Sequence, residues 1–179
     1  MRTSRVNNWL GYFLILLGAA LRFLPHEPNF APITAIALFG GAYLSRRSAI
    51  VLPLAIMIVS DYFIGFYNPA IMASVYLSFA ISGLLGLWLR RRKSVANTLG
   101  VTLTASVQFY LLTNFAVWAF GTMYPHTAAG LLQSYVNALP FFRNTLLGDL
   151  FYVGGLFGIY ELVCYYQFSK QISKPAPES

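Results

Sequence analysis

Long apolar runs separated by short polar segments dominate the chain. Each of six runs is long enough, or nearly so, to cross a bilayer as a helix of about 20 residues. These are Asn8–Leu24, Phe30–Leu44, Ala49–Tyr67, Pro69–Leu89, Val95–Gly121 and Asn144–Phe168. The runs are continuous, show no alternation of apolar and polar residues, and exceed the length of a barrel strand. The pattern therefore predicts an all-α integral membrane protein, a bundle of six transmembrane helices.

The composition supports this interpretation. Of the 179 residues, 58% are hydrophobic and only 9% are charged, whereas about a quarter of the residues in soluble domains are charged. A soluble globule of this length cannot cover so large an apolar content with so few charges. The apolar content also excludes a disordered chain, and Cys164, the single cysteine, cannot form an internal disulfide.

Positive charges gather on one side of the six predicted spans. Ten of the twelve Lys and Arg residues lie before the first span, after the sixth, or in the turns that follow the second and fourth; only Arg22 and Arg143 lie on the other side. Because cationic loops stay in the cytoplasm, this split predicts that both termini are cytoplasmic. It also accounts for the net charge of +7 without a nucleic-acid partner. The Arg90–Lys93 run is interpreted as such a turn, with a lipid-binding or nucleic-acid patch as the alternative.

The chain is predicted to be a single six-helix domain, residues 1–172, followed by a disordered tail, residues 173–179. Arg2 and Arg5 followed by the apolar run Trp9–Leu21 also resemble a secretory signal, so cleavage is the alternative to a retained first span. Retention is preferred because it keeps the cationic turns on one side with an internal amino terminus.

Three polar residues are predicted to lie inside the membrane at a similar depth. At about 1.5 Å per residue, Asp61, Asn114 and Asp149 lie roughly 9, 10 and 8 Å below the outer ends of the third, fifth and sixth spans. Arg22 and Arg143 lie near the same outer side. Ionisable groups at this depth are costly unless they face a wet cavity or each other. The sequence therefore predicts a polar cavity or an ion-pair network in the outer half of the bundle.

Two outer loops are expected to cover this region. The first, residues 23–30, carries two prolines, which stiffen its path, together with His26 and Asn29. The second, Thr122–Phe142, carries His126. Both histidines of the chain therefore lie on the outer side, and both loops are candidate lids for a ligand pocket.

The Ala128–Leu139 stretch of the second loop is predicted to lie as a short helix in the membrane interface. Trp118 belongs to an aromatic group at the same end, which forms either an interfacial belt or a stacking wall for a planar ligand. The candidate ligand-binding residues are His26, Asn29, Asp61, Asn114, Trp118, His126, Arg143 and Asp149.

Motifs for catalysis are lacking. The sequence contains no HExxH zinc motif, no Gly-x-Ser-x-Gly elbow and no phosphate-binding P-loop, so neither an enzyme nor a metal or cofactor site is expected. A paired-aspartate protease built on Asp61 and Asp149 is a minor alternative without the flanking pattern. In the inner half, Gly154 and Gly158 form a GxxxG pair that is expected to pack helices within the bundle. No charged path continues inward, which favours an outward-facing pocket over a channel.

Several segments resemble a known group of membrane proteins. The proline-bearing loop Leu24–Pro32, the run Ala37–Tyr43 before a basic turn, and Leu52-Pro53 leading to Ser60-Asp61 are similar to the substrate-binding S-components of energy-coupling-factor vitamin transporters. Tyr124–Thr127 together with Pro140–Asp149 resembles a largely uncharacterised bacterial membrane family of the same architecture.

The resemblance implies a multi-pass protein of the bacterial cytoplasmic (inner) membrane that takes up a vitamin-like micronutrient. The ligand would bind near the external face under the first and fifth loops, and the cytoplasmic side would dock on a transmembrane coupling subunit and ATPases. The first helix departs from the docking pattern, since it has Gly11 and Gly18 in place of an Ala-x-x-x-Ala pair.

A solitary cobalamin-transporting member of similar size implies cobalamin as one candidate ligand, with His26 or His126 replacing the cobalt-binding cysteine of that member. The alternative to a transport protein is a non-transporting membrane assembly or anchoring protein in which the outer polar cluster is structural.

Overall fold

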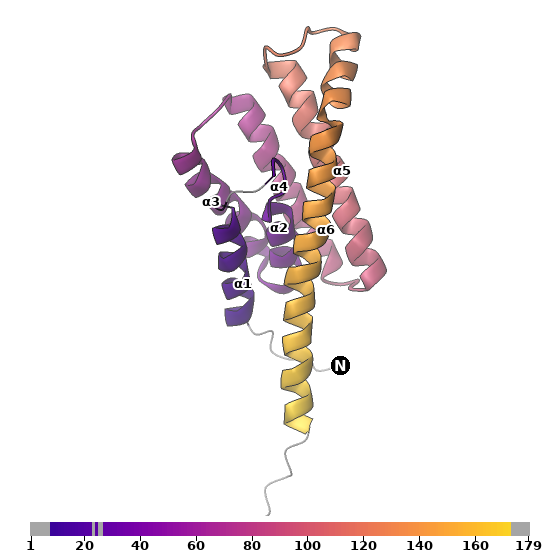
Figure 1. Ribbon diagram of the computed structural model, residues 1–179. Helices are drawn as coiled ribbons and strands as arrows, with labels where there is room; N and C mark the ends of the chain where they lie inside the picture. Colours follow the sequence, from indigo (N-terminus) through magenta and orange to yellow (C-terminus); the bar gives the residue numbers. More distant parts are fainter. Residues whose placement is uncertain (1–7, 23, 25–26, 173–179) are drawn as a thin grey trace, which may run out of the picture.

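The computed structural model describes residues 8–22, 24 and 27–172, and in this part of the chain it contains six α-helices and no β-strand. The helices are α1 (Asn8–Leu21), α2 (Ile33–Tyr43), α3 (Arg46–Ile64), α4 (Pro69–Leu89), α5 (Val95–Phe120) and α6 (Ala128–Ile172), which pack side by side as a bundle (Figure 1). The predicted all-α fold is confirmed. The predicted tail, residues 173–179, lies outside the described residues.

Four helices begin at polar residues that cap them. The side chains of Ser45, Asn68 and Ser94 accept hydrogen bonds from backbone N–H groups in the first turns of α3, α4 and α5. At the start of α6, the Thr127 hydroxyl accepts one from the Gly130 N–H at 3.1 Å. Each cap satisfies backbone donors that the helix itself leaves unpaired. These caps fix the amino ends of the long helices.

Helices α3, α4, α5 and α6 are each long and apolar enough to cross a membrane. Helix α1 has 14 residues and α2 has 11, which is fewer than a helix needs to span the hydrocarbon core. The start of α1 and the end of α6 point to the same end of the bundle (Figure 1). A membrane-type helical fold is therefore present, whereas six spans and cytoplasmic termini stay predictions.

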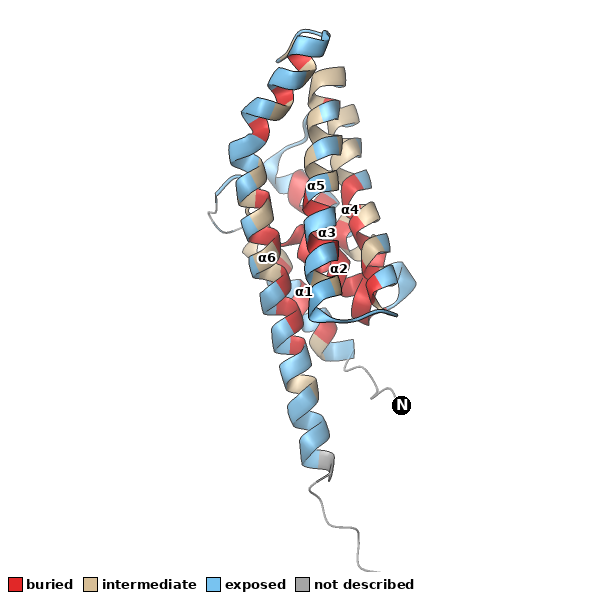
Figure 2. Ribbon diagram, turned by 90° about the vertical axis from the view of Figure 1, so that its right-hand side faces the viewer, coloured by how far each residue is buried: buried red, intermediate tan, exposed pale blue. Residues whose placement is uncertain are grey.

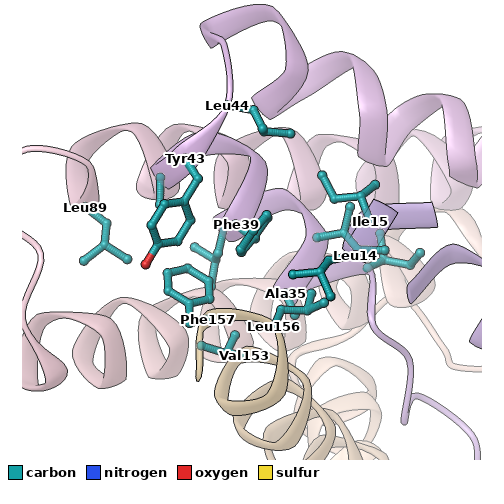
Figure 3. Packing of buried hydrophobic residues seen from close by; sticks show 14 of the residues in the cluster. Leu14, Ile15, Ala35, Phe39, Tyr43, Leu44, Leu89, Val153, Leu156 and Phe157 are labelled. Carbon is teal, nitrogen blue, oxygen red and sulfur yellow. The ribbon is translucent and has the colours of Figure 1, made fainter. Parts of the chain in front are cut away.

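Helix α2 lies inside the bundle, where all eleven of its residues are buried. It carries no charge and, apart from Thr34 and the Tyr43 hydroxyl, no polar side chain, so it can be enclosed by α1, α3, α4 and α6. Figure 2 shows the buried residues gathered around it. Phe39 and Tyr43 of α2 pack against Phe157 of α6, with ring centroids 5.5 and 5.2 Å away (Figure 3). The short second run is thus the centre of the core.

Helices α2 and α4 cross at glycines. A Cβ atom added to Gly41 would lie 2.7 Å from the Cα of Gly86, and one added to Gly86 would lie 2.9 Å from the Cα of Leu38. The two backbones therefore touch, as at other small-residue crossings in membrane bundles. Beyond this crossing, Arg90 donates from Nε to the Gly41 carbonyl at 3.0 Å and from Nη2 to the Leu44 carbonyl. Arg90 thereby caps the buried carboxyl end of α2.

The expected second loop, Thr122–Phe142, is wrong in most of its length. Only residues 121–127 connect α5 to α6, and Ala128–Leu139 forms the first turns of the 45-residue α6, continuous through Pro140. Gly130, Ser134 and Ala138 recur every four residues as a buried stripe of small residues. Gly130 packs closely against Pro125 of the connecting segment, and Ser134 Oγ donates to the Asn114 carbonyl of α5 at 3.4 Å.

Two tyrosines hold the first turns of α6 against α5 by hydrogen bonds. The Tyr110 hydroxyl donates to the Tyr135 carbonyl at 2.7 Å, and the Tyr135 hydroxyl donates to the Leu111 carbonyl at 3.0 Å. Because these hydrogen bonds and the small-residue stripe dock the segment on α5, it does not lie as a separate helix in the interface.

The expected role of Gly154 and Gly158 is also corrected. Both are exposed, and a Cβ added to either would meet no atom within 4 Å. They line a groove of about 450 Å³ between α5 and α6, with Lys93 and Glu161 at one end. The GxxxG pair therefore does not pack helices within this chain.

Candidate functional site

An ion-pair network joins the end of α1 to α3 and α4. Arg22 lies just beyond α1, and its Nη2 is 3.0 Å from Oδ1 of Asp61, while its Nε donates to Ser60 Oγ at 2.7 Å. The Tyr76 hydroxyl donates to Oδ2 of Asp61 at 2.8 Å. Both oxygens of this buried carboxylate are therefore bonded, which offsets the loss of water around it. Arg22, which sequence analysis placed on the same side as Asp61, is its direct partner.

The local structure explains why Asp61 faces Arg22. Asp61 lies in the last turn of α3, and its carbonyl accepts the N–H of Gly65 at 2.8 Å. Gly65 has φ 115°, a left-handed conformation that glycine adopts without strain, so the chain leaves the helix here. Asn68 then starts α4, which brings Tyr76 back to Asp61.

Asp149 of α6 is a second buried carboxylate, 2% exposed, and it accepts a hydrogen bond from Ser106 Oγ at 2.6 Å. It lines a cavity of about 190 Å³ together with Arg22, Asn29 and Thr34. Phe79 and Phe109 are among the apolar residues of the wall. Since the charge of Arg22 is balanced by Asp61, Asp149 is the acidic group that this cavity presents to a ligand.

A second cavity of about 190 Å³ lies beside the first, and the two share four lining residues, Asn29, Val75, Phe109 and Thr145. Asn114 and Tyr110 of α5 and Phe142 of α6 are among the other residues that line it. Asn29 therefore lies where the two cavities meet. The pair of cavities combines a few polar groups with an aromatic wall, which is the usual make-up of a small-molecule site.

The segment between α1 and α2 is held against α6 where it covers the cavities. Asn144 Nδ2 donates to the Pro28 carbonyl at 3.2 Å, and the Phe30 ring lies 5.4 Å from that of Tyr152. Asn29, between these two contacts, has φ 63°. This left-handed conformation is one that asparagine tolerates better than most residues. The first loop thus positions Asn29 at the cavities.

The eight predicted ligand-binding residues fall into separate groups. Asn29 and Asp149 line the first cavity, Asn29 and Asn114 line the second, and Asp61 binds Arg22, a wall residue of the first. Arg143 is exposed on α6 and lines neither cavity, and His26 lies outside the described residues.

Trp118 and His126 lie at the corner between α5 and α6. Trp118 Nε1 donates to the Pro125 carbonyl at 3.1 Å, and its ring centroid is 5.9 Å from that of His126. Neither residue lines the two cavities. This hydrogen bond holds the connection between α5 and α6 against α5, which is a structural role for Trp118.

Sequence reasoning missed the hydroxyl groups of the site, above all Ser106 and Tyr76. A serine inside a membrane helix is a weak signal because it can bond its own backbone, as Ser106 Oγ also does with the Thr102 carbonyl at 3.1 Å. Spacing alone gives no hint that Ser106 also faces Asp149, which lies 43 residues away in the sequence.

At the opposite end of the bundle, Glu161 of α6 accepts a hydrogen bond from the Tyr43 hydroxyl at 2.5 Å and lies 3.9 Å from Lys93 Nζ. Burial lowers the pKa of Lys93, and the negative charge of Glu161 opposes that shift. Among the residues that the structure describes, no three His, Cys, Asp or Glu side chains come together as a group able to hold a metal ion.

Comparison with known proteins gives one match. A family of unknown function (DUF6580) matches residues 2–173. No curated protein and no solved structure matches the chain.

Proposed function

Since the chain belongs to the DUF6580 family, which carries no assigned activity, we propose a function from the site itself: the protein is a membrane-embedded binding protein for a small, vitamin-like micronutrient. The observation that carries the proposal is Asp149, a buried carboxylate that lines a cavity and accepts hydrogen bonds from the hydroxyls of Ser106 and Thr34, while neither ion pair of the described residues gives it a cation. A buried charged or polar group of this kind costs stability unless something binds it.

The surroundings of Asp149 support a ligand with both polar and aromatic character. Asn29 and Arg22 offer hydrogen-bond donors in the lining of the first cavity, and Phe79 and Phe109 add apolar surface to it. Asn114 adds a polar group in the adjoining cavity. Few polar groups placed in an apolar pocket fix the orientation of a ligand, and the apolar wall supplies much of its affinity.

The size of the cavities bears on the ligand class. Each holds about 190 Å³, below the roughly 300–1,000 Å³ of most ligand pockets. Only a ligand that occupies both cavities would reach the lower end of that range. These dimensions favour a compact molecule of one or two rings over cobalamin, whose corrin ring alone exceeds either cavity.

The proposal includes uptake from the outer face, through the first loop, and delivery with the help of a transmembrane coupling subunit and ATPases. The first loop is the segment that would have to move, because its Asn29 separates the cavities from the outer surface and is exposed itself. The contacts of Pro28 and Phe30 with α6 are the ones that opening would break.

A direct test is mass spectrometry of the protein purified from its own host, followed by thermal unfolding with each small molecule found. A ligand that binds the folded state must raise the unfolding temperature. Asp149→Asn should remove that rise, whereas Glu27→Gln, the same change at an exposed carboxylate that lines neither cavity, should retain it. A rise that survives in Asp149→Asn would contradict the proposed site.

A structural role is the second candidate, and the Arg22–Asp61 pair with its Tyr76 bond is the observation that favours it. In that case the polar groups only hold α1, α3 and α4 together in an assembly or anchoring protein. No co-purifying small molecule, together with no stabilisation by a panel of water-soluble vitamins, would support this candidate and overturn the first.

A further inference from the structure

Four arginines surround a hollow at the end of the bundle opposite the two cavities. The hollow has a volume of about 540 Å³ and is lined by Arg46, Leu87, Trp88, Arg90, Arg91 and Arg92. Arg46 is the first residue of α3, and the others come from the end of α4 and the turn after it. Two helix ends therefore bring four cations to one concave surface.

The positive charge of the hollow has no acidic counterpart in the described part of the chain. The two ion pairs there are Arg22–Asp61 and Lys93–Glu161, and neither includes an arginine of the hollow. Burial lowers the pKa of Arg90, and the nearby charge of Arg46 lowers it further. Arg90 is already bonded to the carbonyls of Gly41 and Leu44. Arg46, Arg91 and Arg92 thus remain available to an anion from outside the chain.

The depth of the hollow coincides with the end of a membrane-length helix. Helix α4 ends at Leu89, and Trp88 is 45% exposed beside the hollow. The Arg92 guanidinium lies over the Trp88 ring, 5.4 Å from its centroid. Tryptophan is enriched at the membrane–water boundary, and arginines next to it sit at the level of lipid headgroups.

We propose that this hollow binds the phosphate of an anionic phospholipid headgroup. Arginine forks match the oxygens of a phosphate diester, and three of them can share one anionic headgroup. A soluble phosphate offers the same oxygens, but Leu87 and Trp88 give the hollow an apolar side on which an acyl chain can lie. The proposal does not depend on the ligand cavities at the other end of the bundle.

The test is thermal unfolding of the full chain in a neutral detergent with added phospholipid. Phosphatidylglycerol should raise the unfolding temperature by several degrees, and phosphatidylcholine should raise it far less. The triple variant Arg46→Gln, Arg91→Gln, Arg92→Gln should lose the difference between the two lipids. Lys170→Gln, which removes an exposed positive charge on α6 that does not line the hollow, should keep it.

Other results would overturn the proposal. Equal stabilisation by both lipids would show that the headgroup charge plays no part, and equal stabilisation by inorganic phosphate alone would show a site for a soluble anion. If the triple variant is still stabilised more by phosphatidylglycerol than by phosphatidylcholine, the lipid binds at another place on the protein. If the triple variant does not fold, native mass spectrometry of Arg91→Gln and Arg92→Gln decides: both should carry less bound phosphatidylglycerol than the Lys170→Gln protein, and unchanged occupancy contradicts the proposal.

Discussion

Arg22 contacts Asp61 at 3.0 Å and at the same time lines the cavity that contains Asp149. One guanidinium therefore belongs both to an ion pair that joins three helices and to the wall of the candidate ligand site. Any change at Arg22 must act on stability and on the cavity together. The two carboxylates are linked through this arginine, although their hydrogen bonds go to different groups, with Asp61 bonded to Arg22 and Asp149 to Ser106.

Replacing Arg22 by glutamine should destabilise the protein strongly. Asp61 would keep its Tyr76 bond but lose its counter-charge, and breaking a buried ion pair in this way typically costs about 3–5 kcal/mol. Thermal unfolding in detergent measures the effect. Arg143→Gln, the same substitution at an exposed residue, should change stability by no more than about 0.5 kcal/mol. Equal losses in both variants would contradict the role of the pair.

Asp61→Ala and Asp149→Ala should not act independently. Removing Asp61 frees Arg22, and because Arg22 lines the cavity of Asp149, the second substitution then acts in an altered environment. A double-mutant cycle on the unfolding temperature or on ligand binding should show an interaction of at least about 0.5 kcal/mol. Additive effects would mean that the two carboxylates lie in separate environments.

Local signals in the sequence were enough to predict the long helices up to α5. The predicted span Pro69–Leu89 coincides with α4: the apolar run marks its length, and the Asn68 cap and Pro69 fix its amino end in the structure. The turn at Gly65 was not predicted: the third predicted span continues to Tyr67, while α3 ends at Ile64. A glycine in an apolar run can continue a helix or end it. Gly65 ends α3, because its φ of 115° is a left-handed conformation that cannot continue the helix.

Features that depend on contacts between distant segments could not be predicted. The predicted outer loop extended to Phe142, yet α6 begins at Ala128 and passes through Pro140. The bonds of Tyr110, Ser134 and Tyr135 dock these turns on α5. The site was found in part for the same reason. An ionisable residue inside an apolar run is conspicuous because placing its charge in the membrane costs free energy, so Asp61 and Asp149 were identified. Ser106 could not be identified in this way, because its role comes only from its contact with Asp149 in the fold.

Labelling of single cysteines in a Cys164→Ser background should place Lys93 and the carboxyl terminus in the cytoplasm and His126 outside. The prediction follows from the ten-to-two division of cations. In the structure, Lys93 lies between α4 and α5 and His126 between α5 and α6, so the 26 residues of α5 separate them. A cysteine at position 126 that reacts only from the cytoplasmic side would reverse the topology.

Glycine substitutions should separate the packed crossing from the open groove. In Gly86→Ala the new Cβ would lie 2.9 Å from the Cα of Leu38 on buried α2, closer than real Cβ contacts allow, and backbone atoms cannot swing away as a flexible side chain can. Overpacking of this kind typically costs about 1–3 kcal/mol.

Gly154→Ala is the matched control, because its Cβ would enter open space and alanine favours a helix over glycine. Thermal unfolding should therefore rank Gly86→Ala well below the unaltered protein and Gly154→Ala at or above it. If both variants unfold at the same temperature, α2 and α4 do not meet at Gly86, and the enclosed position of α2 on which the whole core depends would be wrong.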